Sequence, residues 1–561
     1  MRLWQGIAIV GSLCGFTLAV AAPSVERHGA VTVFRIEGMR EFAEATELGA
    51  VTRACAPAQA ALEQFFLARG ATLEPSLLRR SNGLPFCHIF YTPTVPGFRA
   101  SAEDEPITGV FGALDPAHFV AGRAADGDSL DILAQVLSRA PGSVQVALTI
   151  NRDYDERHWP AAVERHFGHT AHQIETRPSR AAGTQPWAQD YVKAGWVGDE
   201  QKLLVPHRLF EGRANDGDAY KPLLDGLEDG PLVRSKLSWE GGDLQFVRDP
   251  TNPARLILFH GSAARSYWGK DLDDAEYAYV LRTEFGADAS VDLSGLSAHV
   301  DYVVALLPLD KTVLLSKPVR GDADLARAAA ALLLEAWGDK APPSLPRLSA
   351  ALASWKPRAD AARIRELLEK TRSEFSQLED DIDDALAADL DAYTKRHCPG
   401  STDCFEGPGR AHMFERDPAL LRRALDGISA MVTRAELAPK LLGVIEAQLR
   451  REPWPRELLL DRKARELEAL GFRVVRAPRI ASENAGNWPG VAYVNALVWG
   501  REIFIPTLGL GEYEQTLLAE LAAQLPSYTL VSTPARDALL RNGGVHCVFA
   551  LVRAKPSAPQ P

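Results

Sequence analysis

The amino-acid sequence predicts a mixed α/β protein in which short buried strands alternate with helices. A strand candidate (SVQVALTI, 143–150) is followed by a segment with helical apolar spacing (158–167) and by a second strand candidate (170–178). Units of the same kind, unrelated to one another in sequence, recur toward the C-terminus, for example over 466–480. Hydrophobic residues make up 46% and charged residues 24% of the 561 residues, which is the ordinary composition of a protein with a packed core.

The N-terminal residues have the pattern of a secretory signal peptide, which we place at residues 1–21. Arg2 supplies the positive charge, residues 7–20 form the apolar stretch, and 19–21 (Ala-Val-Ala) form a small-residue cleavage site. The stretch is short for a membrane anchor, and Leu13 does not suit a lipid-modified cysteine at the next position. We therefore expect a secreted or periplasmic protein without a stable membrane anchor.

Removal of the signal peptide leaves five cysteines, an odd number. In an oxidising compartment Cys55 and Cys87 are expected to pair, as are Cys398 and Cys404 within a turn-rich loop, which leaves Cys547 as a free thiol. A zinc site made by four of these cysteines is the alternative, but their spacing lacks the close pairs of a zinc module.

The region preceding the alternating units is expected to be a separate N-terminal α/β region over 22–140. It holds strand candidates at 30–36 and 86–93 and a helical stretch at 56–69. Residues 100–128 are rich in Asp, Glu, Gly and Pro, which predicts a loop or linker.

The main α/β region is placed at 141–561 and is interrupted by a helical insertion at about 322–452, where Ala, Leu, Glu and Arg follow helical periodicity. An acidic run in this insertion (378–384) is interpreted as solvated helix surface, because the pattern of a calcium-binding loop is absent. The net charge of −11 argues against broad attraction to nucleic acid or anionic membranes.

The C-terminal segment NGGVHCVFALV contains the cysteine of greatest interest. Cys547 on its own is explained by strand packing, but the preceding Gly543 and Gly544 allow the backbone to approach a ligand closely. Alternation along a strand would place Cys547 on one face and His546 on the other, so His546 is not the expected base for the thiol.

Three further motifs carry imidazole or carboxylate groups. His299 and Asp301 are one residue apart, so on a strand both would point into one pocket; an exposed loop is the alternative. Asp190 in WAQDY is either a pocket carboxylate or a turn residue, and the segment from Glu240 to Asp243 (EGGD) is either part of a site or an acidic tight turn.

Taken together, the order W-x-Q-D, EGGD, H-V-D and GG-x-H-C resembles the guanidino-group-modifying enzymes of the pentein fold, and it is most like the protein-arginine deiminases. The segment QDYVKAGW carries the likeness to the deiminases that act on protein arginine, and 491–506 looks like the family's asparagine-containing hairpin. The H-V-D segment departs from the family pattern at Ala298 and Tyr302. The resemblance implies a five-bladed α/β propeller of strand-helix-strand units, with the pocket on its axis.

The resemblance also implies the activity, which is conversion of peptidyl-arginine to peptidyl-citrulline with release of ammonia. Asp190 and Asp301 would bind the guanidinium, Cys547 would attack its carbon, and His299 would act as general acid and base. The remaining substrate-binding residues would be Glu240, Trp187 and Asn495. This chemistry requires no metal or organic cofactor, and no calcium-binding pattern supports a dependence on calcium.

Two other functions remain open at this point. The chain could act on free arginine, agmatine or another small guanidine, as a deiminase or amidinotransferase, or it could be a non-catalytic secreted binding protein of the pentein fold. A papain-like protease is disfavoured, because the H-x-D pair and an acidic pocket have no role in peptide-bond attack. The expected partner is therefore an arginine-containing protein or peptide, or a small guanidine, and no nucleic acid.

Overall fold

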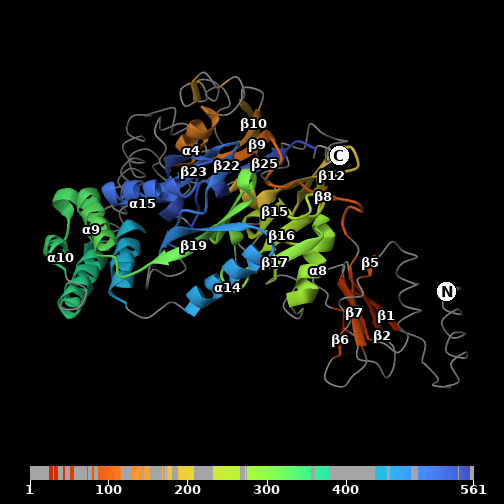
Figure 1. Ribbon diagram of the computed structural model, residues 1–561, viewed down its shortest axis with the longest axis horizontal. Helices are drawn as coiled ribbons and strands as arrows, with labels where there is room; N and C mark the ends of the chain where they lie inside the picture. Colours follow the sequence, from red (N-terminus) through yellow and green to blue (C-terminus); the bar gives the residue numbers. More distant parts are fainter. Residues whose placement is uncertain are drawn as a thin grey trace, which may run out of the picture.

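Figure 1 presents the computed structural model, in which strands and helices alternate along the chain. The predicted mixed α/β class is confirmed. Residues 1–21 and the predicted Cys398–Cys404 disulfide lie outside the described residues. Among the described helices, none combines the length and the hydrophobicity of a membrane span. The structure describes residues 24–28, 31–35, 42–43, 51–55, 72–73, 79–80, 86–91, 93–114, 128–139, 144–151, 164, 167–168, 171, 174–179, 187–207, 232–265, 272, 274–297, 299–355, 360–378, 436–450, 455–481, 490–540 and 542–555.

Five of the sheets repeat one pairing scheme. In the sheet that is simplest to follow, β15 (Leu244–Arg248) and β16 (Leu256–His260) form an antiparallel hairpin, and helix α8 (Asp274–Phe285) then leads to β17 (Ala289–Asp292), which is parallel to β16. A parallel neighbour needs a crossover connection, and a helix is the usual one. The other four sheets likewise pair a first strand antiparallel to a second and a third strand parallel to the second.

One of these four sheets contains β8 (Arg99–Ala100), β12 (Lys193–Val197), β13 (Glu200–Val205) and β14 (Leu232–Arg234). A second contains β18 (Val304–Leu307), β19 (Thr312–Val319), β20 (Arg473–Ile480) and β21 (Val491–Ala492), with helix α14 (Pro455–Ala469) before β20. A third contains β22 (Leu497–Trp499), β23 (Glu502–Thr507) and β24 (Thr529–Pro534), with helix α15 (Glu512–Ala523) before β24, and the fourth contains β25 (Ala550–Arg553), β9 (Ile107–Leu114), β10 (Gln145–Asn151) and β11 (Ile174–Ser179), with helix α4 (Asp128–Leu137) before β10.

The last described strand, β25, belongs to the same sheet as β9, which lies near the start of the chain. Strand β25 pairs antiparallel with β9, although more than four hundred residues separate them, and β8 pairs with β12. The segment predicted as a linker, 100–128, therefore contains β9, a strand that pairs within the main α/β region. The predicted domain boundary at residue 140 is too far along the chain, because β8, β9 and α4 precede it and yet pack with strands that follow it.

Four short 3₁₀ helices each directly precede the first strand of a sheet: η4 (Ala188–Tyr191), η6 (Gly241–Asp243), η7 (Val300–Tyr302) and η10 (His546–Val548). A single tight turn of this kind redirects the chain and aims one or two side chains away from the strand that follows. In this chain, each of these turns carries at least one of the residues that the motifs singled out.

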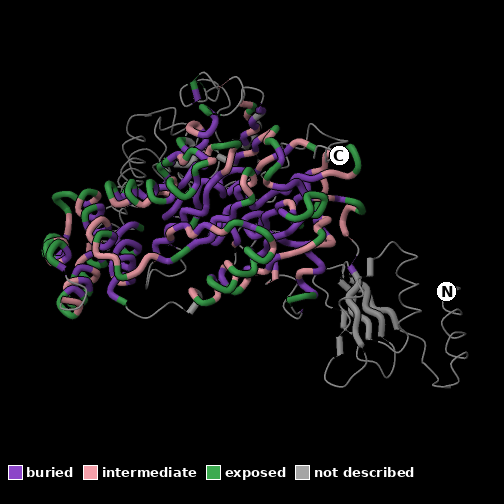
Figure 2. Tube along the Cα trace, viewed as in Figure 1, coloured by how far each residue is buried: buried purple, intermediate pink, exposed green. Residues whose placement is uncertain are grey.

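The strands are hydrophobic because both of their faces are covered. All five residues of β16 and all four of β18 are buried, which is the pattern expected when helices or neighbouring sheets pack on each side. Figure 2 shows this buried interior running through the centre of the described chain. Full burial of one Val, Leu or Ile side chain contributes about 1.5–3 kcal/mol relative to exposure.

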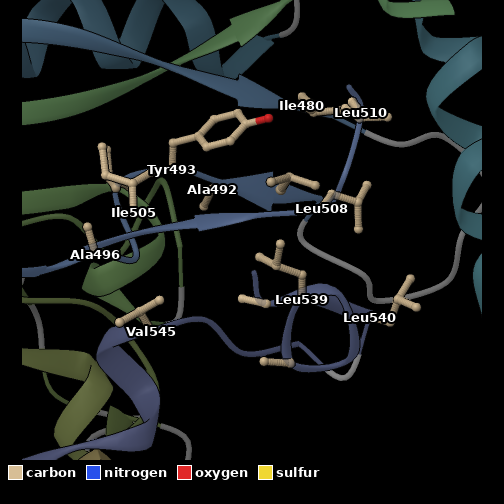
Figure 3. Packing of buried hydrophobic residues seen from close by; sticks show 14 of the residues in the cluster. Ile480, Ala492, Tyr493, Ala496, Ile505, Leu508, Leu510, Leu539, Leu540 and Val545 are labelled. Atoms are coloured by element: carbon tan, nitrogen blue, oxygen red, sulfur yellow. The ribbon is translucent and has the colours of Figure 1, made fainter. Parts of the chain in front are cut away.

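One part of this core supports the nucleophile segment. In Figure 3, Tyr493 and Ile505 lie with Leu508 and Leu539 in the buried cluster that also includes Val545, two residues before Cys547. Helix α16 (Arg536–Leu540) supplies Leu539 to this cluster. The backbone that carries Cys547 is therefore anchored by apolar packing on its N-terminal side.

The predicted helical insertion contains the helices that the sequence pattern indicated. Helix α9 (Ala323–Trp337) begins after Asp322, whose side chain accepts hydrogen bonds from the backbone N–H groups of Asp324 and Leu325, as an N-cap does. Helix α10 (Ser344–Ala353) packs on it, and residues 361–378 and 436–449 are also helical. Figure 1 places α9 and α10 at the end of the molecule opposite the N-terminal strands.

The N-terminal strands form two separate sheets. The strands β1 (Ser24–His28) and β2 (Val31–Arg35) form one, and the other contains β3 (Phe42–Ala43), β4 (Val51–Cys55), β5 (Thr72–Leu73), β6 (Arg79–Arg80) and β7 (Phe86–Tyr91). The Tyr91 hydroxyl donates to Glu284 of α8 at 2.6 Å, so the end of β7 contacts the main α/β region. Cys55 and Cys87 are directly opposite each other on antiparallel β4 and β7. The helix predicted at 56–69 lies outside the described residues.

Candidate active site

The candidate nucleophile is buried and its thiol contacts two polar side chains. Cys547 is 6% exposed and, as predicted, takes part in no disulfide. Its Sγ lies 3.2 Å from Asp301 Oδ2 and accepts a hydrogen bond from Asn495 Nδ2 at 3.1 Å. Burial raises the pKa of the Cys547 thiol well above its usual value, and the negative charges of Asp301 and Asp190 raise it further. The thiol therefore carries its proton at neutral pH unless a positive group offsets these charges.

The backbone around Cys547 is not the strand that the sequence predicted. Residues 546–548 form the 3₁₀ helix η10, and β25 begins only at Ala550. Strand alternation therefore does not apply, and the expectation that His546 faces away from Cys547 is wrong. The imidazole Nδ1 of His546 lies 3.2 Å from the same oxygen of Asp301 that the thiol contacts.

The candidate acid and base is held by a carboxylate. His299 Nε2 lies 2.5 Å from Glu240 Oε2. Burial alone would lower the pKa of His299, but the charge of Asp190, the hydrogen bond to Glu240 and the charge of Asp301 together raise it to about 10. The imidazole is therefore protonated at neutral pH. His299 and Asp301 share one site as expected, but through the turn of η7 rather than along a strand.

Asp190 and Asp301 approach each other across Gly242. Asp190 Oδ1 accepts the backbone N–H of Gly242 at 2.9 Å. A Cβ placed on Gly242 would lie 2.6 Å from His299 Nδ1 and 3.1 Å from an oxygen of each aspartate. Both carboxylates and the imidazole therefore surround one backbone position that has no side chain, and the interpretation of EGGD as an isolated acidic turn is wrong.

Two of the carboxylates near the imidazole differ in charge. Burial opposes ionisation of Asp301, but the hydrogen bond from His546 and the nearby imidazoles lower its pKa below the usual value. Asp243 is completely buried, and burial raises the pKa of its carboxyl well above the usual value. Asp301 is thus an anion at neutral pH, whereas burial favours the protonated form of Asp243, although both belong to the acidic motifs of the sequence.

Trp187 and Asn495 line the segment that leads to Cys547. A Cβ on Gly543 would lie 2.2 Å from the Trp187 ring, and a Cβ on Gly544 would lie 2.5 Å from Asn495 Oδ1. The two glycines are therefore required by close approach, as the sequence indicated. Trp187 is 8% exposed, so little of its ring is open to solvent.

Asp190, Glu240 and His299 also offer ligand atoms that lie within 4.8 Å of one another, close enough to hold a metal ion. An imidazole ligates a metal only in its neutral form. The pKa of His299 is raised to about 10, so a metal ion would have to displace the imidazole proton, whereas an organic cation could interact with the carboxylates and leave the imidazole protonated.

Three residues at the site were not assigned a role from the sequence. Tyr302 donates a hydrogen bond to the carbonyl oxygen of Asn542, on the nucleophile segment, and His546 contacts Asp301. Lys193 is 7% exposed, and burial lowers its pKa to about 8. The only signal for these residues was their position within or next to the motifs, because none of their contacts is local in sequence.

The site as a whole brings together residues from four separate motifs. A protonated imidazole and two buried aspartates lie around the backbone of Gly242, the thiol contacts one of these aspartates, and an asparagine amide contacts the sulfur. The carboxylates suit a planar cation that can donate several hydrogen bonds.

No family model matches the chain, and no curated protein matches its sequence. Several solved structures resemble it in fold. An agmatine deiminase of C. jejuni is 11% identical, with a TM-score of 0.44 over 82% of this chain and 96% of the other. A putative arginine deiminase from Porphyromonas gingivalis is 12% identical, with a TM-score of 0.43 over 81% and 98%. A dimethylarginine dimethylaminohydrolase is 11% identical, with a TM-score of 0.33 over 79% and 99%. These resembling structures are guanidino-group-modifying enzymes of the pentein fold.

Proposed function

We propose that the protein hydrolyses a guanidinium group to a ureido group and ammonia. One observation carries this proposal: an oxygen of Asp190 and an oxygen of Asp301 lie at the same distance from the Cβ position of Gly242, next to a protonated imidazole, and Asp301 contacts a free thiol. A guanidinium is a planar cation with N–H groups on two edges, so two carboxylates can hold it while its carbon stays accessible to sulfur.

The first half of the reaction begins with binding of the cation. The positive substrate offsets the charges of Asp190 and Asp301, which lowers the cost of ionising Cys547, and the thiol proton leaves to solvent. The thiolate then forms a bond to the guanidinium carbon. His299, already protonated, gives its proton to the departing nitrogen, and ammonia leaves as the C–N bond breaks.

The second half returns the enzyme to its starting state. His299, now neutral, removes a proton from a water molecule as the water oxygen bonds to the same carbon. The C–S bond breaks, the hydroxyl on the carbon loses its proton to give the urea carbonyl, and the leaving thiolate takes up a proton, which restores the thiol. The departed ammonia takes up the proton that the thiol first gave to solvent. One guanidinium and one water are thus converted to one urea-type product and one ammonium ion, without any change of oxidation state.

We propose peptidyl-arginine as the substrate, supported by the likeness of the segment QDYVKAGW to the deiminases that act on protein arginine. We also propose that the five sheets with a shared pairing scheme are the blades of a five-bladed propeller, which the pairing of β25 with β9 would close. Export after removal of residues 1–21 is proposed from the pattern of the first residues.

A parallel assay tests the function. Ureido product and ammonia are measured with an arginine-containing peptide blocked at both ends, with free arginine and with agmatine, using the parent chain and Cys547→Ser. The blocked peptide is expected to be turned over best, and Cys547→Ser is expected to be folded and inactive, since a hydroxyl is a far poorer nucleophile near neutral pH.

A preference for agmatine or free arginine would replace the peptidyl-arginine proposal and keep the guanidine chemistry. Retention of most of the activity by folded Cys547→Ser would remove the thiol from the mechanism. If no guanidine is bound or turned over by the parent chain, the proposed function is wrong.

A further inference from the structure

His546 lies directly before the candidate nucleophile and is 5% exposed. Its backbone N–H donates to the carbonyl oxygen of Asn495 at 3.2 Å, and its own carbonyl oxygen accepts from Phe549 at 3.3 Å. The imidazole is therefore carried on the same short helix as the thiol and is held at both ends of that turn. Any shift of His546 would move Cys547 with it.

The two oxygens of Asp301 have different surroundings. Oδ2 lies 3.2 Å from His546 Nδ1 and 3.2 Å from Cys547 Sγ. Oδ1 is buried and has no hydrogen-bond partner among the described residues. A buried carboxylate oxygen without a partner costs free energy, so the contacts to Oδ2 are the described hydrogen bonds that hold this side chain. Oδ2 is also the Asp301 oxygen nearest the Cβ position of Gly242, where Asp190 Oδ1 lies at the same distance.

The contact between the thiol and Oδ2 lasts only while the thiol holds its proton. Once Cys547 becomes a thiolate or is bonded to carbon, it no longer donates to Asp301. His546 Nδ1 is then the donor to Oδ2 that remains among the described contacts. We propose that His546 is a positioning residue that holds Oδ2 of Asp301 throughout turnover and so keeps this carboxylate oriented toward the guanidinium; this inference rests on the proposed function.

The groups around His546 define the charges that act on it. Glu103, on the segment before β9, ion-pairs with Arg553 of β25, and the charges of both His546 and Lys193 lower the pKa of Glu103 against its burial. Lys193 of β12 also interacts with Asp301.

The other charged or titratable groups near Asp301 are His299, Cys547, Tyr302 and, beside the same Gly242, the carboxylate of Asp190. Among these neighbours His546 supplies the described hydrogen bond from an imidazole. Removal of that hydrogen bond is expected to make Asp301 easier to protonate, because the contact with the Cys547 side chain is then the hydrogen bond that remains among the described contacts.

Two substitutions separate the hydrogen bond from the ring. Asparagine carries its amide nitrogen on Cγ, as histidine carries Nδ1, whereas glutamine carries its amide nitrogen one bond farther, as histidine carries Nε2. His546→Asn can keep the donor to Asp301, and His546→Gln removes it while keeping a buried amide. Val548→Ala, in the same helix and 2% exposed at the parent residue, is a control for simple loss of packing.

Binding of the best guanidine is measured by calorimetry between pH 3 and pH 9 in a Cys547→Ser background, and kcat/KM is measured over the same range with the thiol present. We expect His546→Gln to weaken guanidine binding at low pH by about tenfold to a hundredfold, the effect of one hydrogen bond to a charged group. The acid limb of both profiles should move to higher pH. His546→Asn should stay close to the parent, and Val548→Ala should lower the melting temperature without moving the acid limb.

An acid limb that is unchanged in folded His546→Gln overturns the proposal, as does an equal loss of binding in His546→Asn and His546→Gln without a shift in pH. These outcomes are distinct from failure of the proposed function, in which the Cys547→Ser protein with native His546 binds no guanidine at any pH. If His546→Gln does not fold, His546→Ala replaces it as the variant without the donor. The proposal is then supported if the acid limb shifts in His546→Ala and stays unshifted in His546→Asn, and it is refuted if the two variants have identical acid limbs.

Discussion

Asp301→Asn is expected to lower kcat/KM for a guanidine by about two to four orders of magnitude. The change keeps the shape of the side chain but removes a charge that is completely buried, and it places an amide N–H₂ or an uncharged oxygen opposite His546 and Cys547. Removal of one partner from a buried charged pair costs about 3–5 kcal/mol, and each 1.4 kcal/mol is about a factor of ten in rate.

The assay is the initial rate of ureido product formation with the guanidine that the parent chain turns over best, with kcat and KM determined separately and folding checked by circular dichroism. Asp243→Asn is the matched control. Asp243 is equally buried, but burial raises the pKa of its carboxyl and favours the neutral form, which asparagine resembles in shape. Asp243→Asn is expected to stay within about tenfold of the parent, since the favoured form carries no charge to lose.

The same loss is expected for Asp190→Asn, whose carboxylate accepts from the backbone of Gly242. If Asp190→Asn and Asp301→Asn both retain activity within about threefold of the parent on every guanidine tested, a difference below about 1 kcal/mol, the two carboxylates do not bind the cation. If Asp243→Asn loses as much activity as they do, charge is not the property that matters at these positions.

Gly242→Ala is expected to abolish guanidine binding in a folded protein, because the new methyl carbon would lie 2.6 Å from the His299 ring; calorimetric binding equal to the parent would contradict this. The pKa of His299 is raised from 6.5 to about 10, so its protonated form contributes stability that is fully present below pH 6.5 and is lost as the pH rises toward about 10. Urea unfolding should therefore show a larger difference between parent and His299→Ala at pH 6 than at pH 10, and an equal difference would refute the shift. Cys55 and Cys87 face each other across antiparallel strands, at a separation typical of disulfides; non-reducing peptide mapping should find them joined and Cys547 free, and a disulfide that includes Cys547 would overturn the assignment.

The motifs could be found from the sequence because each is a short run of residues with few structural explanations. Glu240 to Asp243 and the Gly543–Gly544 pair contain glycines that only close approach requires, and the structure places another group within 2.6 Å of where a Cβ would be on Gly242, Gly543 and Gly544. The mixed α/β class followed from alternating periodicity. The boundary at residue 140 was wrong because β9 pairs with β25, and local composition carries no information about which distant strand a segment pairs with.

The local geometry of the site could not be obtained in the same way. A strand and a 3₁₀ turn of three residues are nearly equivalent in sequence, since both tolerate apolar and polar residues in short runs. The choice between them reversed the direction of one side chain: His546, expected on the far face of a strand, contacts Asp301.

The sequence by itself determined which residue types this protein can use: one free thiol, two imidazoles beside acidic motifs, and glycines where the backbone must come close. Only the tertiary structure decided their states. Asp243 and Asp301 are both buried aspartates, yet the pKa of Asp243 is raised and that of Asp301 is lowered, because burial dominates at Asp243 while His546 and His299 lie beside Asp301. A pKa depends on the charges and donors within a few ångströms, and residues hundreds of positions apart in the chain supply them here.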